Sequence, residues 1–356
     1  MKKVNFFTVA ATFAGCFLGA GYVSGQELKQ FFGDYGSNWV LGLLVAVIAQ
    51  LVLGVVILLV SRRTGDVAMD RVVVPKSLPW LRNFMGIAIA LMLFVINVTM
   101  FAAFGAMLHQ MTGGTIPVIV GSALLTLVVC VLALLGLRGM VAVFSMVVPI
   151  LVVASIAICI AAVSKYGIHA PDLCVSDGTS IRGTWWVSAI TFVSYNIFGS
   201  IGIMAPMGPM IPKKRTIFFG IASGAVALTA IAAGILLAMY SYPAGLDAQL
   251  PMVAVASSLS PVLGVVYAVL LFGGMLGTSL AGTVAIDIYI HQRKEETKKF
   301  RKPIIIAISV AGFAASLVGF SELVGTVYPL FGYCGLLAIA GLFINFFSSL
   351  KKKSKA

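Results

Sequence analysis

The sequence predicts an all-α polytopic membrane protein with about ten transmembrane helices. Of its 356 residues, 60% are hydrophobic and 10% are charged, and the mean hydropathy is +1.08, whereas soluble domains carry roughly 25% charged residues. Long apolar runs recur from end to end, without the period-two alternation of a membrane β-barrel. Basic residues gather between these runs. Together these observations exclude a soluble enzyme, a secreted disulfide scaffold and a disordered chain.

Ten stretches are long enough to cross a bilayer, which takes about 20 helical residues. They are residues 5–32, 37–61, 83–111, 116–137, 140–164, 184–210, 216–240, 253–290, 303–320 and 323–350. The first follows Lys2 and Lys3, as a signal peptide would, but it continues past Cys16 to Phe32, so we expect a membrane helix and no cleavage. The eighth is too long for one span, and its first part should form a short separate helix.

The basic residues predict the orientation of these spans. With the N-terminus inside, 21 basic residues fall on the inside, and only Lys29, Lys165 and Arg182 fall outside. This asymmetry predicts a multi-pass protein of the cytoplasmic membrane with both termini in the cytoplasm. The net charge of +13 therefore reflects topology, and no nucleic-acid partner is expected. The Lys-rich C-terminal tail can also contact anionic membrane lipid.

The longest outside loop, residues 165–183, separates two sets of five spans within one membrane domain. The first set covers residues 1–164 and the second covers residues 184–350. Because five is odd, the two halves should have opposite topology. An inverted pair of repeats is a common plan of secondary transporters.

Glycines interrupt the first span. Gly15, Gly19, Gly21 and Gly25 fall within eleven residues, and each glycine in a helix interior costs about 1 kcal/mol relative to alanine. Their G-x-x-x-G spacing also suits close helix packing. The polar residues that follow would be costly against lipid, which favours an unwound stretch with free backbone groups.

The sixth span, the first of the second half, has a similar composition. Glycines, small polar residues and prolines concentrate over residues 194–202 and 206–209. The coincidence predicts that helices 1 and 6 are both broken and that their freed backbone groups bind a small solute near the membrane midplane. The expected solute-binding residues are Gly19, Ala20, Gly21, Ser24, Glu27, Asn97, Ser194, Tyr195, Asn196 and Gly199.

Two of these residues have alternative interpretations. Glu27 could bind a solute amine, carry a coupling proton or line an outer gate, or it could be an interfacial carboxylate paired with Lys29. Asn97 lies in the middle of the third span, where it could reach the solute or form a hydrogen bond between helices.

Residues 19–27 read GAGYVSGQE. This stretch resembles the G-A-G-F-A-S-G-Q-E signature of the YkvI-like bacterial membrane proteins, from which Tyr22 and Val23 depart conservatively. That family resembles the amino acid–polyamine–organocation superfamily. The resemblance implies the LeuT-type fold of five plus five inverted helices, with helix three lining the site, but it implies no particular substrate.

The same resemblance implies a candidate sodium site. Similar proteins that use sodium place hydroxyls of helix eight beside carbonyls of the unwound helix one. Here Thr278 and Ser279 would supply the hydroxyls, and Gly15 and Leu18 the carbonyls. Oxygen ligands suit such a hard cation. Helix packing is the alternative explanation of these small residues.

These features favour a secondary active transporter of a small organic solute, an amino acid or related compound, that works by alternating access and is coupled to sodium or protons. The alternative is a non-transporting sensor or receptor subunit that binds its ligand in the same pocket. No P-loop, H-E-x-x-H or Ser-His-Asp order suggests an enzyme, and no cofactor is expected. The cysteines contain no C-x-x-C pair and predict neither a disulfide framework nor a zinc site; they are Cys16, Cys130, Cys159, Cys174 and Cys334.

Overall fold

The computed structural model describes residues 4–65, 69–74, 79–135, 138–169, 181, 183–293 and 299–353. Every regular element in these ranges is helical. Cys174 and most of the 165–183 loop lie outside the described residues, and so does the side chain of Ala20.

The described part of the chain forms fifteen α-helical elements joined by short 3₁₀ and π-helical segments. The α-helices are α1 (Phe6–Phe17), α2 (Ala20–Val23), α3 (Gln26–Phe31), α4 (Trp39–Thr64), α5 (Met69–Val73), α6 (Pro79–Met111), α7 (Val118–Leu135), α8 (Arg138–Tyr166), α9 (Trp185–Met204), α10 (Lys214–Ser241), α11 (Pro251–Leu259), α12 (Pro261–Arg293), α13 (Arg301–Ser316), α14 (Phe320–Glu322) and α15 (Tyr328–Lys353). The other segments are η1 (Gly33–Asn38), η2 (Ala205–Met210), η3 (Pro243–Gly245) and the π-helical η5 (Leu323–Val327).

Seven helical segments in the described part are long and apolar enough to cross a membrane. They are Gly33–Thr64, Pro79–Met111, Val118–Leu135, Trp185–Met210, Lys214–Ser241, Pro261–His291 and Phe320–Ser348. Shorter apolar helices cover Phe6–Phe17 and Ile150–Tyr166. The chain is therefore an all-helical, multi-span membrane protein, and the exact count of ten spans stays a prediction. The eighth expected span is divided into α11 and α12, as its length suggested.

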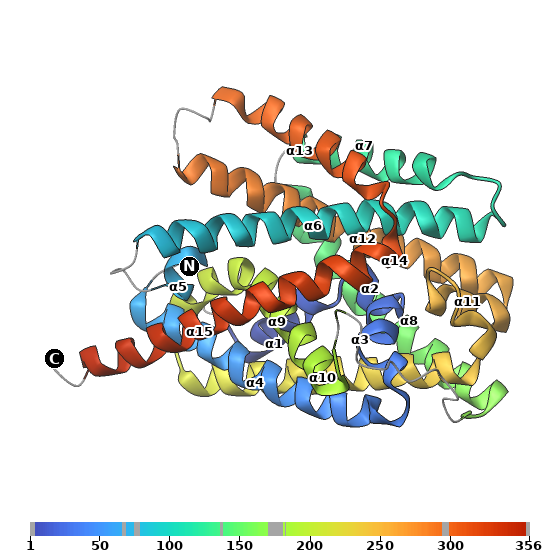
Figure 1. Ribbon diagram of the computed structural model, residues 1–356, viewed down its shortest axis with the longest axis horizontal. Helices are drawn as coiled ribbons and strands as arrows, with labels where there is room; N and C mark the ends of the chain where they lie inside the picture. The colour runs from blue at the N-terminus through green and yellow to red at the C-terminus, as the bar shows by residue number, and fades with distance from the viewer. Residues whose placement is uncertain are drawn as a thin grey trace.

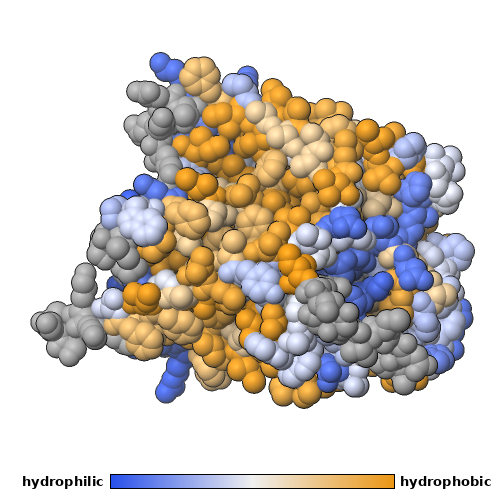
Figure 2. Space-filling view, viewed as in Figure 1, coloured by the Kyte–Doolittle hydropathy of each residue, from blue (hydrophilic) through white to orange (hydrophobic). Residues whose placement is uncertain are grey.

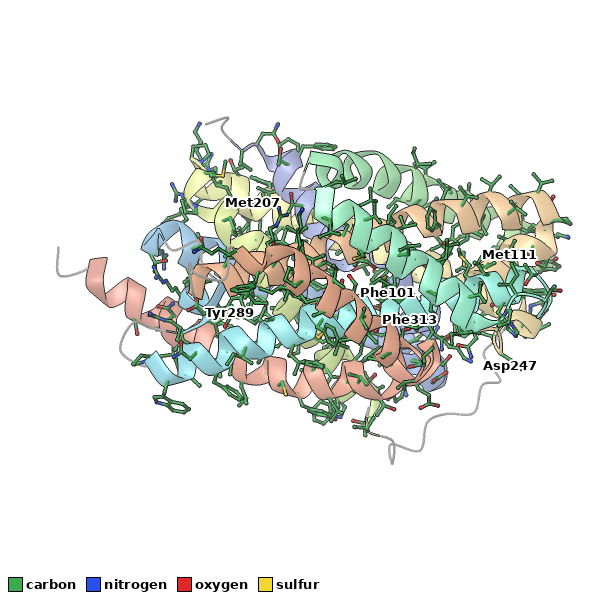
Figure 3. All side chains as sticks on the ribbon, turned by 90° about the horizontal axis from the view of Figure 1, so that it is seen from above. Phe101, Met111, Met207, Asp247, Tyr289 and Phe313 are labelled. Carbon is green, nitrogen blue, oxygen red and sulfur yellow. The ribbon has the colours of Figure 1, made fainter. Side chains whose placement is uncertain are left out.

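The long helices run along the long axis of the molecule, and α1, α2 and α3 lie among them (Figure 1). Figure 3 places Met111 and Asp247 toward one end and Met207 and Tyr289 toward the other. Hydrophobic residues cover the middle of the face in Figure 2, and hydrophilic residues gather toward the end where α11 lies. This distribution suits helices that cross an apolar layer.

Small residues allow α1 to pack closely against α10. A Cβ atom on Gly220 would lie 2.6 Å from the Cβ of Val9, and one on Gly224 would lie 3.0 Å from the backbone oxygen of Ala10. Glycine is the residue that permits such approach of two helices in a membrane. The first span is thereby anchored by its N-terminal half.

The first span is broken, as expected. Helix α1 ends at Phe17, α2 forms one turn over Ala20–Val23, and α3 begins at Gln26. The chain therefore leaves the helical path twice, at residues 18–19 and at residues 24–25.

The break expected at residues 194–202 is wrong, because α9 is continuous from Trp185 to Met204. The irregular segment η2 follows only at Ala205–Met210. Two polar side chains of this stretch bond helix carbonyls and leave the backbone of α9 intact: Asn196 donates to the oxygen of Phe192 at 3.0 Å, and Ser194 donates to that of Gly332 at 2.7 Å. The small residues here serve the packing of α9 on α15.

Candidate functional site

The geometry of the break depends on two glycines. The amide of Gly19 donates to the oxygen of Phe17 at 2.7 Å, and Val23 closes the turn of α2 by donating to Gly19 at 3.2 Å. Gly25 has a φ of +86°, a left-handed conformation that glycine adopts without the penalty of a Cβ atom. This residue turns the chain into α3, so that the N-terminal end of α3 faces α2.

Groups from three other helices bond residues 22–24, and a fourth helix supports one of those groups. Tyr267 of α12 donates to the oxygen of Val23 at 2.6 Å, and the hydroxyl of Tyr22 donates to the oxygen of Leu228 on α10 at 2.7 Å. The Met252 amide of α11 donates to the oxygen of Ser24 at 2.9 Å. Ser155 of α8 bonds the Tyr267 hydroxyl at 3.0 Å. In an apolar layer such partners are required wherever a helix is interrupted.

The two sides of the break differ in access. A Cβ atom placed on Gly15 or Gly19 would meet nothing within 4 Å, and both residues are partly exposed. Every residue from Gly21 to Leu28 is buried. The break is therefore open on the side of α1 and closed on the side of α3.

Glu27 reaches back from α3 and covers Gly21. A Cβ atom on Gly21 would lie 2.7 Å from both Cγ and Cδ of Glu27. The Glu27 side chain is buried, at 4% exposure, and the hydroxyl of Tyr195 on α9 donates to its carboxyl group. Lys29 instead donates to the oxygen of Leu246 at 2.7 Å, so the alternative pairing of Glu27 with Lys29 is wrong.

Aromatic rings surround the Glu27–Tyr195 contact. The Tyr195 ring lies 4.8 Å from that of Tyr328, 5.5 Å from Phe31 and 5.7 Å from Phe192, measured between centroids. The sequence alone does not single out Tyr328, Phe31 or Phe192, because apolar spans contain many aromatic residues and no local pattern distinguishes these three.

The other expected solute residues lie in contacts between or within helices. Ser24 donates to the oxygen of Gly21 at 3.1 Å and so stabilises the turn. A Cβ atom on Gly199 would meet only the Cδ1 of Ile96, at 3.3 Å. The side chain of Asn97 bonds Thr283 of α12 at 3.0 Å, which matches the alternative of an interhelical hydrogen bond. The structure thus groups Gly21, Glu27 and Tyr195 and places Asn97, Ser194 and Asn196 in helix packing.

The hydroxyls proposed for a cation differ in their surroundings. The Oγ of Ser279 is buried and has no hydrogen-bond partner in the described part of the chain, whereas Thr278 is half-buried. Within that part, no group of three or more His, Cys, Asp or Glu residues could hold a metal ion. A sodium site built from Gly15, Leu18, Thr278 and Ser279 stays a prediction.

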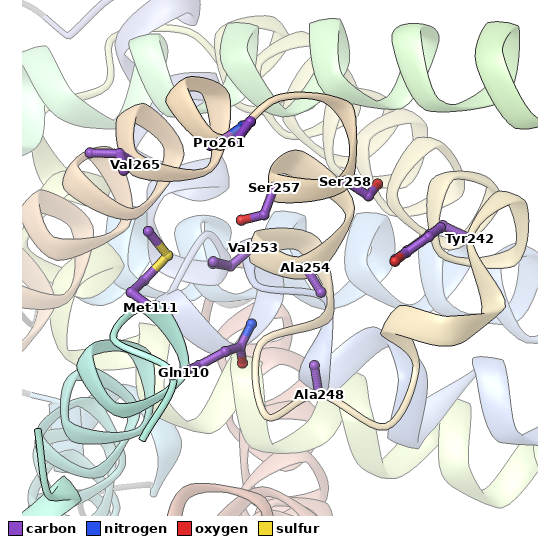
Figure 4. A pocket seen from close by; sticks show the side chains of 11 residues that line it. Gln110, Met111, Tyr242, Ala248, Val253, Ala254, Ser257, Ser258, Pro261 and Val265 are labelled. Carbon is purple, nitrogen blue, oxygen red and sulfur yellow. The ribbon is translucent and has the colours of Figure 1, made fainter. Parts of the chain in front are cut away.

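A separate cavity of about 660 Å³ lies where the end of α6 meets α11 and the start of α12 (Figure 4). Its lining includes Gln110, Tyr242, Ser257 and Val265. The backbone amide of Leu250, directly before α11, donates to the side-chain oxygen of Gln110 at 3.0 Å, and the side-chain nitrogen of Gln110 donates to the backbone oxygen of Leu250 at 3.2 Å. The cavity is thus bordered by the helix whose Met252 contacts the break, but Glu27 and Gly21 do not line it.

Comparisons with known proteins agree with this architecture. No protein-family model matches the chain. The membrane protein YkvI of Bacillus subtilis (strain 168) is 20% identical to it over 342 residues, which cover 94% of each chain. The chain is homologous to YkvI over its full length. YyaD of the same organism is 23% identical over 344 residues, covering 93% of this chain and 94% of YyaD.

Solved structures share the fold. MhsT, in complex with L-phenylalanine, matches with a TM-score of 0.65 at 16% identity and covers 96% of both chains. A Na⁺-coupled sialic acid symporter matches with a TM-score of 0.65 at 14% identity over 96% of this chain and 79% of its own. Mhp1, a nucleobase-cation-symport-1 family transporter, matches with a TM-score of 0.63 at 13% identity. The match covers 93% of this chain and 75% of the Mhp1 chain. At these identities the likeness shows the fold, which is the LeuT-type fold of transporters.

Proposed function

We propose that this homologue of YkvI is a secondary active transporter that moves a small organic solute, an amino acid or related compound, by alternating access. One observation carries the proposal: the first helix is broken in the core of a LeuT-type fold, with open space beside Gly19 and a buried carboxyl group over Gly21. Solved relatives of this fold include an L-phenylalanine complex and a sialic acid symporter, which supports a small organic solute.

The proposed topology has ten spans in two inverted halves, residues 1–164 and 184–350, with both termini cytoplasmic. Met111 ends α6 at the side expected outside, Asp247 lies in a loop expected outside, and Met207 and Tyr289 lie near loops expected inside. Their placement at opposite ends of the molecule supports this alternation (Figure 3). On this topology the break is open toward the cytoplasm and closed toward the outside.

Solute would bind beside Gly19, Gly21, Glu27 and Tyr195, and release to the outside would require α3 to separate from its neighbours. Gln26 donates to the Ser321 hydroxyl of α14 at 2.9 Å, and Ser321 donates to Gln249, before α11, at 2.8 Å. These exposed or half-buried hydrogen bonds exchange readily with water, so they suit a gate that opens and closes. Coupling would come from sodium at Gly15, Leu18, Thr278 and Ser279, or from a proton on Glu27.

Uptake into proteoliposomes tests this proposal. Purified protein is first screened by thermal shift against amino acids and related metabolites, because a ligand that binds the native state raises its stability. A stabilising ligand is then supplied in radiolabelled form under imposed sodium and proton gradients. Uptake that follows one of the gradients is expected. Tight binding without uptake under either gradient would reject transport and favour the sensor or receptor subunit.

A further inference from the structure

Another cavity, of about 380 Å³, lies between the end of α7 and the start of α13. Helices α7 and α13 lie along one edge of the molecule (Figure 1), and no residue of the broken first helix lines this cavity. On the proposed topology this end of the two helices is cytoplasmic. The lining combines three apolar and three basic residues, which are Leu134, Pro303, Ile305, Lys299, Arg301 and Lys302.

Arg301 joins α13 to two neighbouring helices, and its charge is already balanced. Its Nε donates to the Asp287 carboxylate of α12 at 3.0 Å, and its Nη2 donates to the backbone oxygen of Ala133 on α7 at 3.4 Å. Asp287 is buried, and a buried carboxylate needs such a positive partner. The Arg301–Asp287 pair therefore belongs to the packing of the helices, and the net charge of the cavity comes from the lysines.

Lys299 and Lys302 carry positive charge without a counter-ion. Both residues are exposed, and no acidic side chain in the described part of the chain pairs with either of them. The residues that precede them, 294–298, contain two lysines and two glutamates, so this stretch adds no net charge. The cavity thus attracts an anion.

The N-terminus of α13 adds to this attraction. The residue before the helix is Phe300, which forms no capping hydrogen bond, and the first turn contains no acidic residue. The first amides of a helix have no partner within it, and this end of the helix carries partial positive charge. Where no capping side chain serves these amides, water or a bound anion does, and phosphate groups commonly bind at such a place.

Exposed apolar side chains continue from the cavity along both helices. Residues Leu127, Val131 and Leu135 of α7, and Ile306 and Val310 of α13, are between 46% and 79% exposed. Their spacing of four residues places them on one face of each helix. A soluble anion would leave this apolar surface uncovered, whereas the acyl chains of a phospholipid would cover it.

We propose that this cavity binds an anionic phospholipid of the cytoplasmic leaflet. The phosphate group pairs with Lys299 and Lys302 at the start of α13, and the acyl chains lie along the exposed faces of α7 and α13. Basic pockets between membrane helices on the cytoplasmic side suit such headgroups. The inference goes beyond the proposed transport and does not depend on it, and it uses the proposed orientation only to name the leaflet.

The test compares probes that share either the acyl chains or the phosphate group. Dioleoyl phosphatidylglycerol is anionic, dioleoyl phosphatidylcholine has the same acyl chains without net charge, and glycerol phosphate has no acyl chains. Lipid binding to the purified full-length protein is measured by native mass spectrometry. The Kd for phosphatidylglycerol should be at least tenfold lower than that for phosphatidylcholine. Glycerol phosphate at about 10 mM should give no thermal shift, because a ligand far below its Kd does not stabilise the native state.

The double variant Lys299→Gln/Lys302→Gln removes the two unpaired charges. The Kd for phosphatidylglycerol should rise at least tenfold, and that for phosphatidylcholine should stay within twofold. The matched control is Lys213→Gln/Lys214→Gln, since these two lysines are also exposed at the start of a helix, α10, on the side expected to be cytoplasmic. They do not line the cavity, so the control should leave the Kd for phosphatidylglycerol within twofold.

A photoreactive lipid locates the site without any substitution. Phosphatidylglycerol that carries a diazirine on one acyl chain should, after irradiation, be attached to peptides of α7 and α13 in the unmodified protein. Excess unlabelled phosphatidylglycerol should compete with this labelling, and excess phosphatidylcholine should not.

Four results would overturn the proposal. Equal affinity for the two lipids would reject a charged site, and an equal loss in both double variants would reduce the effect to general surface charge. Glycerol phosphate that binds as tightly as phosphatidylglycerol would assign the cavity to a soluble phosphate compound. Labelling spread over helices other than α7 and α13 would place the lipid elsewhere. Failure of the proposed transport is a separate result, because absent solute uptake would leave these lipid affinities as they are.

Discussion

The four glycines of the first span serve different purposes. Gly15 and Gly19 border open space, Gly21 is covered by the carboxyl group of Glu27, and Gly25 holds a left-handed conformation. The G-x-x-x-G spacing alone would assign all of them to one role, which is close helix packing. Substitutions at each position should therefore give different results.

Gly21→Ala should weaken solute binding, because the new methyl group would occupy the space of the Glu27 carboxyl group. We expect a loss of at least tenfold in affinity for the ligand identified by thermal shift, about 1.4 kcal/mol. Gly19→Ala provides the control for folding, since its methyl group meets nothing within 4 Å, and its unfolding midpoint should match that of the unmodified protein. Equal affinity in Gly21→Ala would contradict the placement of the site.

Gly25→Ala should destabilise the protein. A left-handed conformation costs a residue with a Cβ atom roughly 1–2 kcal/mol, and here the methyl group would also lie 2.7 Å from the sulfur of Met239. Gly65 at the end of α4 has a φ of +69° with open space around it. Gly65→Ala therefore measures only the free-energy cost of the left-handed backbone conformation, without a steric contact. Thermal unfolding in detergent should show the larger loss for Gly25→Ala. Equal losses would mean that Met239 moves aside freely.

Ser279→Ala should reduce stabilisation by sodium, because it removes a buried hydroxyl that has no partner in the described part of the chain. Thr278→Val should act in the same direction. Ser309→Ala is a matched control, since that buried hydroxyl already donates to the oxygen of Ile305. Thermal shift as a function of sodium concentration, at constant ionic strength, measures the effect, which we expect to be at least tenfold in apparent affinity. A sodium response that is unchanged in both variants would reject this site.

At the scale of the element, α1 and α9 show how similar compositions give different backbones. In the first span the polar groups of the break are bonded by distant side chains such as Tyr267. In α9 the polar side chains bond helix carbonyls, and Gly332 and Gly335 of α15 allow close contact with Thr191 and Ser194. Small polar residues can thus accompany a break in a helix or stabilise the contact between two helices. The packing partner of the helix determines which of the two occurs.

Ser194→Ala should lower stability and leave solute affinity unchanged. The variant loses the hydrogen bond to the buried oxygen of Gly332, which is worth about 1 kcal/mol. Ser223→Ala removes an exposed hydroxyl that bonds its own helix and should have little effect. Thermal unfolding and ligand titration of the two variants make the comparison. If Ser194→Ala instead lowered the affinity for the solute and left thermal stability unchanged, Ser194 would belong to the solute site.

The sequence predicted those features that local composition controls. The membrane class follows from hydropathy, and the break in the first span follows from its clustered glycines and the polar residues after them. The continuity of α9 was missed because it depends on contacts with Gly332, 138 residues further along. The burial of Glu27 does not follow from local composition, because it requires the left-handed turn at Gly25, and a glycine in a sequence does not reveal the sign of its φ.

At the scale of the whole molecule, the topology makes a prediction of its own. In a cysteine-free background, Thr115→Cys between α6 and α7 should react with a membrane-impermeant maleimide in intact cells. Lys213→Cys before α10 should react only after permeabilisation, because the positive-inside rule places that loop in the cytoplasm. Both positions are exposed, so the labelling depends on which side of the membrane each position faces. The opposite labelling pattern would invert the proposed orientation.

The partners of α2 also constrain the order of events during synthesis. Tyr22 and Val23 are synthesised well before the groups that bond them, which follow 206 and 244 residues later in the chain. At about 5–20 residues per second, this interval lasts roughly 10–50 s. During that time the Tyr22 hydroxyl and the Val23 oxygen lack these partners. Unsatisfied polar groups are unfavourable in hydrocarbon. The broken helix therefore gains its full set of partners only when Tyr267 of α12 has been synthesised.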